Sequence, residues 1–337
     1  MVYSCNYPIW VTFDTSGNSD FVYNIQINNI ASAYQGRIKL FDTTTTTVQI
    51  DISNICRDFL ETFYEDVIKN DYSSGIIVPT HGNTGTAIHV SVYLDDPAEP
   101  VFSEIVVYDY NTEYVSQLAN VRYLNNPITN YMDIRQHIPV SASCINSSGY
   151  FEYYRNGTLV SSPAIPTSIQ HTLYWADAGA LGVEVGDTLR FGVRNGGYSE
   201  YNVVEPCRNR YVLYYVNKTG GLDFILCSGR YVESWSPDRT DVRLHADRGN
   251  RTGFEQKRIS QEINRQWQLN TMFIKSENLD KIDELIYSPK IFIHDLDKET
   301  ITSCMIADTN YSVKYTPRYD VPFYSINVKE SHKQLRR

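Results

Sequence analysis

Alternation of apolar and polar residues predicts strands along most of the chain. It appears at Ile9, Val11 and Phe13, and again within residues 22–27. A two-residue period marks a strand with one buried face and one solvated face. The first 135 residues therefore read as a β-rich region.

One amphipathic helix interrupts this region. Ser53 is a suitable N-cap, and the apolar residues after it recur with the i, i+1, i+4, i+5 spacing of a single helical face. These residues are Ile55, Cys56, Phe59, Leu60, Phe63, Tyr64, Val67 and Ile68. The opposite face is charged, so the pattern predicts a helix packed on a sheet.

Residues 136–206 have the pattern of a small all-β domain. The predicted strands are 148–155, 158–161, 168–175 and 187–194. Asn156-Gly157, two prolines and Gly196-Gly197 separate them. Short strands at this spacing, with turn residues between them, are typical of a β-sandwich.

Residues 207–337 combine strands with one short helix. Strands are predicted at 210–217, 266–274, 290–296, 300–307, 311–315 and 322–330. The helix is expected to start after Ser276 and to end before Pro289, with Leu279, Ile282 and Leu285 as its apolar stripe. We expect that stripe to cover the sheet face formed by Trp267 and Leu269.

These patterns predict a mainly β fold, built from multi-domain β-sandwich modules with a few short helices packed on sheets. Three domains are expected. They are an N-terminal β-rich domain with one helix (1–135), a small β-sandwich (136–206), and a C-terminal β module with one helix and an Arg-rich arm (207–337).

The Arg-rich arm is a polar stretch with few large apolar residues, at residues 237–258. Its basic residues are Arg239, Arg243, Arg248, Arg251, Lys257 and Arg258. A long insertion in a compact domain is usually functional, and Arg suits bidentate contacts with carboxylates. We predict an assembly arm ordered by a neighbouring subunit. The alternative is an ordinary hairpin folded on its own domain.

Composition narrows the function classes. The net charge is −9, which disfavours nucleic-acid binding, and aromatic residues reach 13% with 27 tyrosines. Six cysteines lie at wide spacings without a CxxC pair, so neither a disulfide framework nor a zinc site is indicated. No secretory signal and no stretch of about 18 apolar residues is visible, so we expect no membrane insertion.

Catalytic motifs are absent from the sequence. No GxSxG, HExxH, GxxxxGK[ST] or GxGxxG occurs, and no two histidines have metal-ligand spacing. Paired acids such as Asp95-Asp96, Glu65-Asp66 and Asp295 with Asp297 are read as turn or surface residues rather than a glycosidase pair. We therefore expect no enzyme, no cofactor and no metal.

Two strings of the C-terminal third are similar to a signature of known proteins. The first runs from Cys207 and Tyr211 through Asn217 to Gly220-Gly221-x-Asp223. The second comprises Trp267-x-Leu269-Asn270-Thr271, Ala307-Asp308-Thr309, Tyr311 to Tyr315, and Tyr324-x-Ile326-Asn327-Val328-x-Glu330-Ser331. They resemble tail structural proteins of phages that infect Bacteroides-like gut bacteria, of the tail hub, distal tail or baseplate type.

This resemblance implies a virion structural protein that forms a symmetric ring in the phage tail and is assembled in the host cytoplasm. It implies other copies of the chain and other tail or portal-proximal proteins as partners, and no catalytic residues. A ring subunit needs two complementary patches. The alternative is a receptor- or glycan-binding module of the tail, since Tyr-rich surfaces serve both sugars and protein interfaces.

Overall fold

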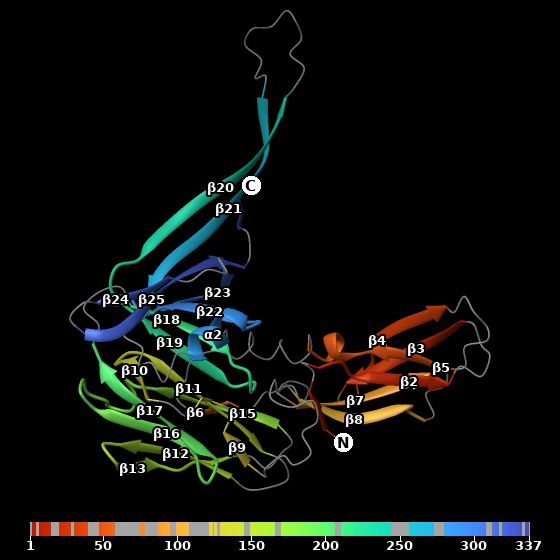
Figure 1. Ribbon diagram of the computed structural model, residues 1–337, viewed down its shortest axis with the longest axis horizontal. Coiled ribbons are helices and arrows are strands. Elements are labelled where there is room, and N and C mark those ends of the chain that lie inside the picture. Colours follow the sequence, from red (N-terminus) through yellow and green to blue (C-terminus); the bar gives the residue numbers. More distant parts are fainter. Residues whose placement is uncertain are drawn as a thin grey trace, which may run out of the picture. The chain divides into compact units, whose positions relative to one another are not determined.

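The structure is a computed structural model. It describes residues 2–4, 7–14, 20–27, 30–39, 47–57, 75–77, 87–94, 99–107, 121–123, 125–126, 129–144, 149–165, 170–205, 210–243, 256–272, 280–307, 312–316, 319–331 and 334–336. The fold is mainly β with few short helices, as predicted (Figure 1). Within these residues, no helix is both long enough and apolar enough to cross a bilayer.

The chain divides into two compact units. The first is Met1–Val204 with Val216–Asp223, and the second is Glu205–Tyr215 with Phe224–Arg337. The predicted division into three domains stays a prediction.

The first sheet of the first unit has the order β1-β8-β7-β3-β4. Its strands are β1 (Val2–Ser4), β8 (Phe102–Val107), β7 (Ala87–Leu94), β3 (Asp20–Ile27) and β4 (Ile30–Lys39). A two-stranded sheet joins β2 (Trp10–Asp14) to β5 (Thr47–Asp51). The alternating apolar residues are the buried ones, as in Val11, Phe13 and Ile25. Burial of one face on a two-residue period explains these strands.

The predicted helix is present, but it begins one residue earlier than the sequence predicts. Residues 53–57 are helical, and the Cys56 N–H donates to the Ile52 carbonyl. Ile52 thus holds the N-cap position that was predicted for Ser53. The Asp51 Oδ1 accepts a bond of 2.9 Å from the Ser53 N–H, and so caps the first turn. The rest of the predicted helix lies outside the described residues.

Two further sheets of the first unit form a sandwich. One has the order β10-β17-β16-β12-β13, with β14 beside β12, and the other has the order β6-β15-β11-β9. The strands are β6 (Gly75–Ile77), β9 (Val121–Tyr123), β10 (Thr129–Asp133), β11 (His137–Cys144), β12 (Gly149–Arg155), β13 (Thr158–Ser161), β14 (Ala164–Ile165), β15 (Gln170–Asp177), β16 (Thr188–Val193) and β17 (Gly197–Val204). The bounds of β12, β13, β15 and β16 confirm the four strands predicted here within two residues.

Aromatic side chains join the two sheets of the sandwich. The rings of Phe151 on β12 and Tyr174 on β15 are 5.5 Å apart, and the Tyr123 hydroxyl on β9 hydrogen-bonds to Ser199 on β17. Trp175, the residue after Tyr174 on β15, is also fully buried. Sheet pairs that interdigitate in this way exclude water from a core of stacked side chains.

A buried polar network holds the turn between Asn217 and Asp223 in the first unit. The Asp223 carboxylate, 2% exposed, accepts bonds from the Asn125 Nδ2 at 2.9 Å, the Asn126 N–H at 3.2 Å and the Asn217 Nδ2 at 2.8 Å. The Asn217 Oδ1 accepts from the Gly221 N–H at 2.8 Å. Buried polar groups need such partners, so these residues build a structural turn.

The second unit is organised around a closed ring of strands. The order is β19-β18-β22-β23-β25-β21-β20, with β24 beside β25 and β26 beside β21. The strands are β18 (Tyr211–Val216), β19 (Leu222–Cys227), β20 (Val232–Arg243), β21 (Gln256–Asn270), β22 (Ile291–Asp295), β23 (Thr300–Ile306), β24 (Ser312–Thr316), β25 (Tyr319–Glu330) and β26 (Gln334–Arg336).

The end of β21 bonds back to the end of β19 and closes six of these strands into a barrel. The Ser228 N–H donates to the Asn270 carbonyl and the Met272 N–H to the Leu226 carbonyl, each at 3.0 Å. Cys227 and Thr271 form the bridge between them. Closure removes the free edges that β19 and β21 would otherwise expose along this part of the sheet.

Alternate residues of every barrel strand fill a single core. Its members are Tyr211, Leu213, Tyr215, Ile225, Cys227, Trp267, Leu269, Ile291, Ile293, Cys304, Tyr324, Ile326 and Val328. Ile282 and Leu285 of the helix α2 (Asp280–Tyr287) join this core. The predicted contact of the helix stripe with the face of Trp267 and Leu269 is therefore confirmed for these two residues. Leu279 lies outside the described residues.

Candidate functional site

The Arg-rich arm forms a long two-stranded ribbon. Strands β20 and β21 pair from Val232 opposite Gln268 to Arg243 opposite Gln256, with one shift in register after Thr240. Figure 1 shows this ribbon extending beyond the other strands of its own unit. The sequence placed a single strand at 266–274, but β21 begins ten residues earlier because its outer half finds its partner in β20.

The outer part of the ribbon has few strand neighbours. Strand β21 pairs with β25 through Gln266–Asn270 and with β26 through Gln261–Ile263. Strand β20 ends the sheet order, so within the described part of the chain its outer edge has no strand beside it. Such an edge presents unpaired N–H and C=O groups that can pair with another chain.

The structure brings together four of the six predicted arm residues. Arg239 and Arg243 lie on β20, and Lys257 and Arg258 lie on β21. Arg258 stands opposite Asp241 in the register. The other two, Arg248 and Arg251, lie outside the described residues. The dependence of the ribbon on a neighbouring subunit stays a prediction.

At the base of the ribbon, the side chain of Arg265 contacts the rings of two tryptophans. The Arg265 guanidinium lies 4.9 Å from the Trp235 ring and 4.5 Å from the Trp267 ring. Its Nε donates to Glu233 Oε1 at 2.6 Å. Trp267 belongs to the barrel core, whereas Trp235 is 52% exposed. Cation–π contacts and a charge-assisted bond thus link the barrel core to the ribbon.

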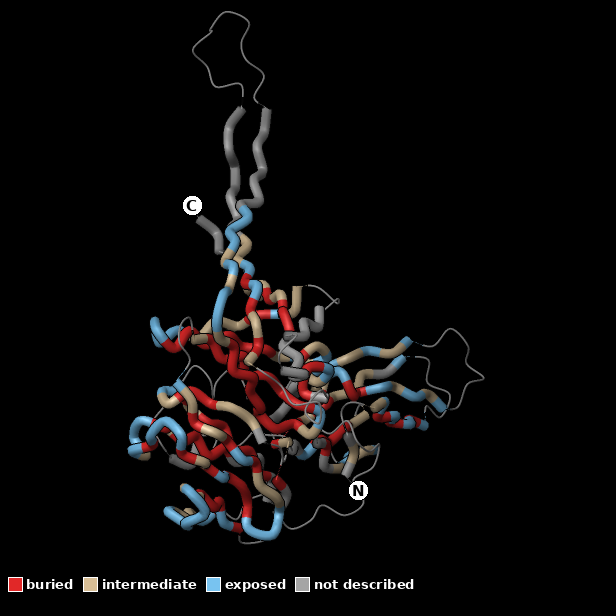
Figure 2. The backbone as a smooth tube through the Cα atoms, turned by 60° about the vertical axis from the view of Figure 1, so that its left-hand side comes forward, coloured by how far each residue is buried: buried red, intermediate tan, exposed pale blue. Residues whose placement is uncertain are grey.

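This base cluster was not predicted from the sequence. A signal existed, because Trp235 and Trp267 are two of only four tryptophans and each flanks the Arg-rich stretch. The pairing could not be seen without the register that sets Trp235 opposite Arg265. Residues of β20 near the base of the ribbon are exposed and appear in pale blue in Figure 2. The base of the ribbon is therefore a candidate contact surface.

A tyrosine pair borders the ribbon base. The rings of Tyr211 and Tyr231 meet edge to face with centroids 5.0 Å apart. Burial raises the pKa of the Tyr211 phenol well above its ordinary value, and the hydrogen bond with Tyr231 and the charge of Asp295 act in the same direction. The phenol therefore stays protonated and serves as a neutral hydrogen-bonding group.

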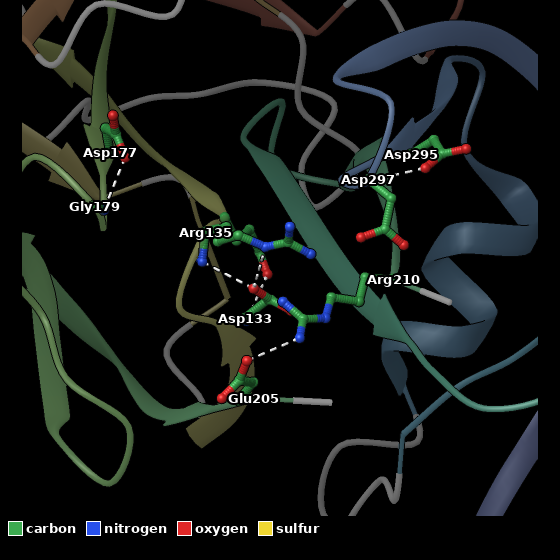
Figure 3. Close-up of polar contacts among 9 residues, drawn as sticks. Asp133, Arg135, Asp177, Gly179, Glu205, Arg210, Asp295 and Asp297 are labelled. Carbon is green, nitrogen blue, oxygen red and sulfur yellow. Dashed lines mark hydrogen bonds and ion pairs between the residues drawn. The ribbon is translucent and has the colours of Figure 1, made fainter. Parts of the chain in front are cut away.

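The acidic pair Asp295 and Asp297 organises a turn. The Asp295 carboxylate accepts a bond of 3.1 Å from the Asp297 N–H (Figure 3). It accepts another of 3.2 Å from the Lys298 N–H. The Lys298 Nζ lies 2.9 Å from its other oxygen. This is the turn chemistry of an aspartate that follows a strand. The pairs Asp95-Asp96 and Glu65-Asp66 lie outside the described residues.

The other polar contacts in Figure 3 are also local. Asp133 accepts from the Arg135 N–H at 2.8 Å, and Asp177 accepts from the Gly179 N–H at 2.8 Å. The Arg210 guanidinium bonds to Glu205 at 3.0 Å. Among the residues that the structure describes, no cluster of histidine, cysteine, aspartate or glutamate has the arrangement of a metal site.

A second surface lies on the outer face of the sandwich, on β12, β16 and β17. We call its members Tyr150, Glu152, Tyr154, Arg190, Arg194 and Tyr198 the Tyr–Arg platform. Glu152, only 5% exposed, accepts bonds from the hydroxyls of Tyr154 and Tyr198 and from the Arg194 Nε. Three donors, from β12, from β17 and from the turn that follows β16, thus converge on one carboxylate.

These hydrogen bonds hold the charge on Glu152. The bond from Tyr198 is the main cause that lowers the pKa of the Glu152 carboxyl below its ordinary 4.5, and the bonds from Arg194 and Tyr154 add to it. A carboxylate with several donors is stabilised in its charged form. Burial raises the pKa of the Tyr198 phenol, and the hydrogen bond with Glu152 and its charge act in the same direction.

We predict a pH-dependent contribution of Glu152 to stability. Because its folded pKa lies below the unfolded one, the contribution is present above about pH 4.5 and is lost as the pH falls through the folded value. Urea unfolding at neutral pH should show Glu152→Gln less stable than the wild type by about 1–2 kcal/mol. This difference should shrink steadily below pH 4.

Glu200→Gln is the control for this prediction, because Glu200 is exposed on the neighbouring strand β17. It should change the free energy of unfolding by less than about 0.5 kcal/mol at every pH. A Glu152→Gln deficit that persisted unchanged at pH 3 would contradict the assignment, since protonated Glu152 and Gln should then behave alike.

Comparison with known proteins adds no family to this description. No protein-family model matches the chain, and no curated protein shows significant similarity to it.

Proposed function

We propose that this chain is a structural subunit of a phage tail, a tail hub, distal tail or baseplate component that acts through protein–protein contacts. In this proposal it forms a symmetric ring with other copies of itself and binds other tail or portal-proximal proteins in the virion. It carries out no catalysis and needs no cofactor.

Two lines of argument support the proposal. The first is that two strings of the C-terminal third resemble tail proteins. These strings fall on β18, β21 and β25 of the barrel. The second is the ribbon β20–β21, and this observation carries the proposal. It offers a strand edge twelve residues long, with an exposed tryptophan at its base. A neighbouring subunit can pair with such an edge by strand addition.

Shortening the ribbon tests this function. Replacing residues 239–261 by Asn-Gly would join Asp238 to Glu262, which stand opposite each other, by a two-residue hairpin turn. We expect the full chain to form closed rings in negative-stain electron microscopy and the shortened chain to remain monomeric. The melting temperatures of the two should be similar, since the barrel core is retained.

A protease experiment separates assembly from simple folding. Under limited trypsin digestion, the free subunit should be cut within 237–258 and the assembled ring should be protected there. Equal protection in both states would favour the ordinary hairpin. A full-length chain that stays monomeric alone and with co-expressed tail proteins, yet folds, would overturn the proposed function.

A further inference from the structure

The Tyr–Arg platform is built around Arg190, which stands opposite Glu200 of β17 in the register of the sheet. The Arg190 guanidinium lies 3.9 Å from the centroid of the Tyr198 ring and 5.3 Å from that of Tyr154. In the described part of the chain, no carboxylate lies within ion-pair distance of it. Glu152, which lies beside it on the platform, is instead neutralised by Arg194 at 2.7 Å.

A glycine sets the position of this arginine. Gly192 stands between Glu152 and Tyr198 in the register of the three strands. A Cβ at this position would collide with the Gly197 carbonyl oxygen and the Tyr198 ring. The missing side chain lets the Tyr198 ring lie across β16, so that its hydroxyl reaches Glu152 and its face supports Arg190.

The platform is therefore preorganised. The two tyrosine hydroxyls are fixed by Glu152, and the Arg194 guanidinium is fixed by Glu152 and Ser162 and lies 4.6 Å from the Tyr150 ring. Immobilised side chains lose little entropy when a partner binds. Arg190 presents its planar fork of donors on this rigid support.

The surroundings have the composition of a protein interface. Leu159 on β13 stands opposite Tyr154 in the register and is 46% exposed, and the neighbouring Val160 is 54% exposed. Tyr and Arg beside exposed apolar residues are the usual centre of a protein contact. The platform spans neighbouring strands of a sheet face, whereas small-molecule sites are usually concave.

We propose that the Tyr–Arg platform binds a carboxylate-bearing surface of a second copy of this chain. Charge complementarity points to this occupant, since the chain has a net charge of −9. The ribbon stretch 237–258 carries six basic and four acidic residues. The residues outside this stretch therefore have a net charge that is more negative than −9. The inference rests on the proposed ring, because it names the second of the two non-identical patches that a ring needs.

Arg190→Gln tests the platform. Sedimentation velocity of the full chain should show self-association weakened by about tenfold or more, as for the loss of a charged interface contact. Arg190 is exposed, so the melting temperature should not change. Lys39→Gln removes a positive charge from an exposed position on β4, away from both proposed contact surfaces in the sequence, and should associate like the wild type. Added salt should weaken the wild type more than Arg190→Gln.

The remaining outcomes separate this inference from the proposed function. If Arg190→Gln forms rings as well as the wild type while the ribbon-shortened chain does not, the platform inference fails and the tail function stands. If the full chain does not self-associate, either alone or with co-expressed tail proteins, both fail. If polygalacturonate binds the wild type and not Arg190→Gln, and self-association is equal in both, the occupant is an acidic polysaccharide and the second-copy proposal is overturned.

Discussion

Ile282→Asp should leave the barrel of the second unit unable to fold stably. Ile282 on α2 is 1% exposed and lies in the core with Trp267 and Leu269. The substitution removes a large apolar side chain and places a carboxylate among the aliphatic and aromatic side chains of the core. We expect the free energy of unfolding to fall by at least about 4 kcal/mol, a large part of the stability of an ordinary domain.

Thermal unfolding and soluble yield measure this effect. Tyr287→Asp is the matched control, because it introduces the same charge at an 82% exposed position of the same helix and should cost less than about 0.5 kcal/mol. If Ile282→Asp is too insoluble to measure, Ile282→Ala should still lower the free energy of unfolding by about 2–5 kcal/mol. An unchanged melting temperature in both Ile282 variants would show that α2 does not pack on the barrel core.

Asp223→Ala should produce the second large loss of stability. Removing this buried carboxylate takes away one acceptor from each of Asn125, Asn126 and Asn217. Hydrogen bonds to a buried charged group are among the stronger ones, so the loss of three should be large. We expect the free energy of unfolding to fall by about 2–4 kcal/mol in urea titrations.

An exposed aspartate provides the control for this result. Asp20 forms a surface ion pair with Arg37, and Asp20→Ala should lower the free energy of unfolding far less than Asp223→Ala, because exposed ion pairs contribute little to stability. A double-mutant cycle of Asp223→Ala with Asn217→Ala should show strong coupling, because the two side chains bond directly at 2.8 Å. Simple additivity of the two losses would contradict the network.

Asn217, Gly220, Gly221 and Asp223 also clarify the signature string to which they belong. In the sequence they stood out only as part of a resemblance to tail proteins. In the structure Asn217 and Asp223 bond to each other across a turn, and Asp223 also accepts a bond from Asn125, which precedes both by more than ninety residues. The string therefore records a folding requirement, and a test of function belongs on the ribbon and the platform instead.

Local patterns alone determined the β class, the sandwich strands between 149 and 193, and the helix α2. In each case one face of an element is buried, and burial leaves a period of 2 or 3.6 in the sequence. The same reasoning paired the stripe of Ile282 and Leu285 with Trp267 and Leu269. The length and polar composition of the Arg-rich stretch also indicated an extended arm or a hairpin, but they could not say which strand it would join.

Only the tertiary structure decided how distant residues meet. The closure of the barrel depends on bonds between Leu226–Ser228 and Asn270–Met272, and the base of the ribbon depends on Arg265 lying between Trp235 and Trp267. The platform depends on an absent side chain at Gly192, a space that Tyr198 fills from the next strand. Register and cross-strand packing create these sites, and neither leaves a period in the sequence, because each joins residues that belong to different strands.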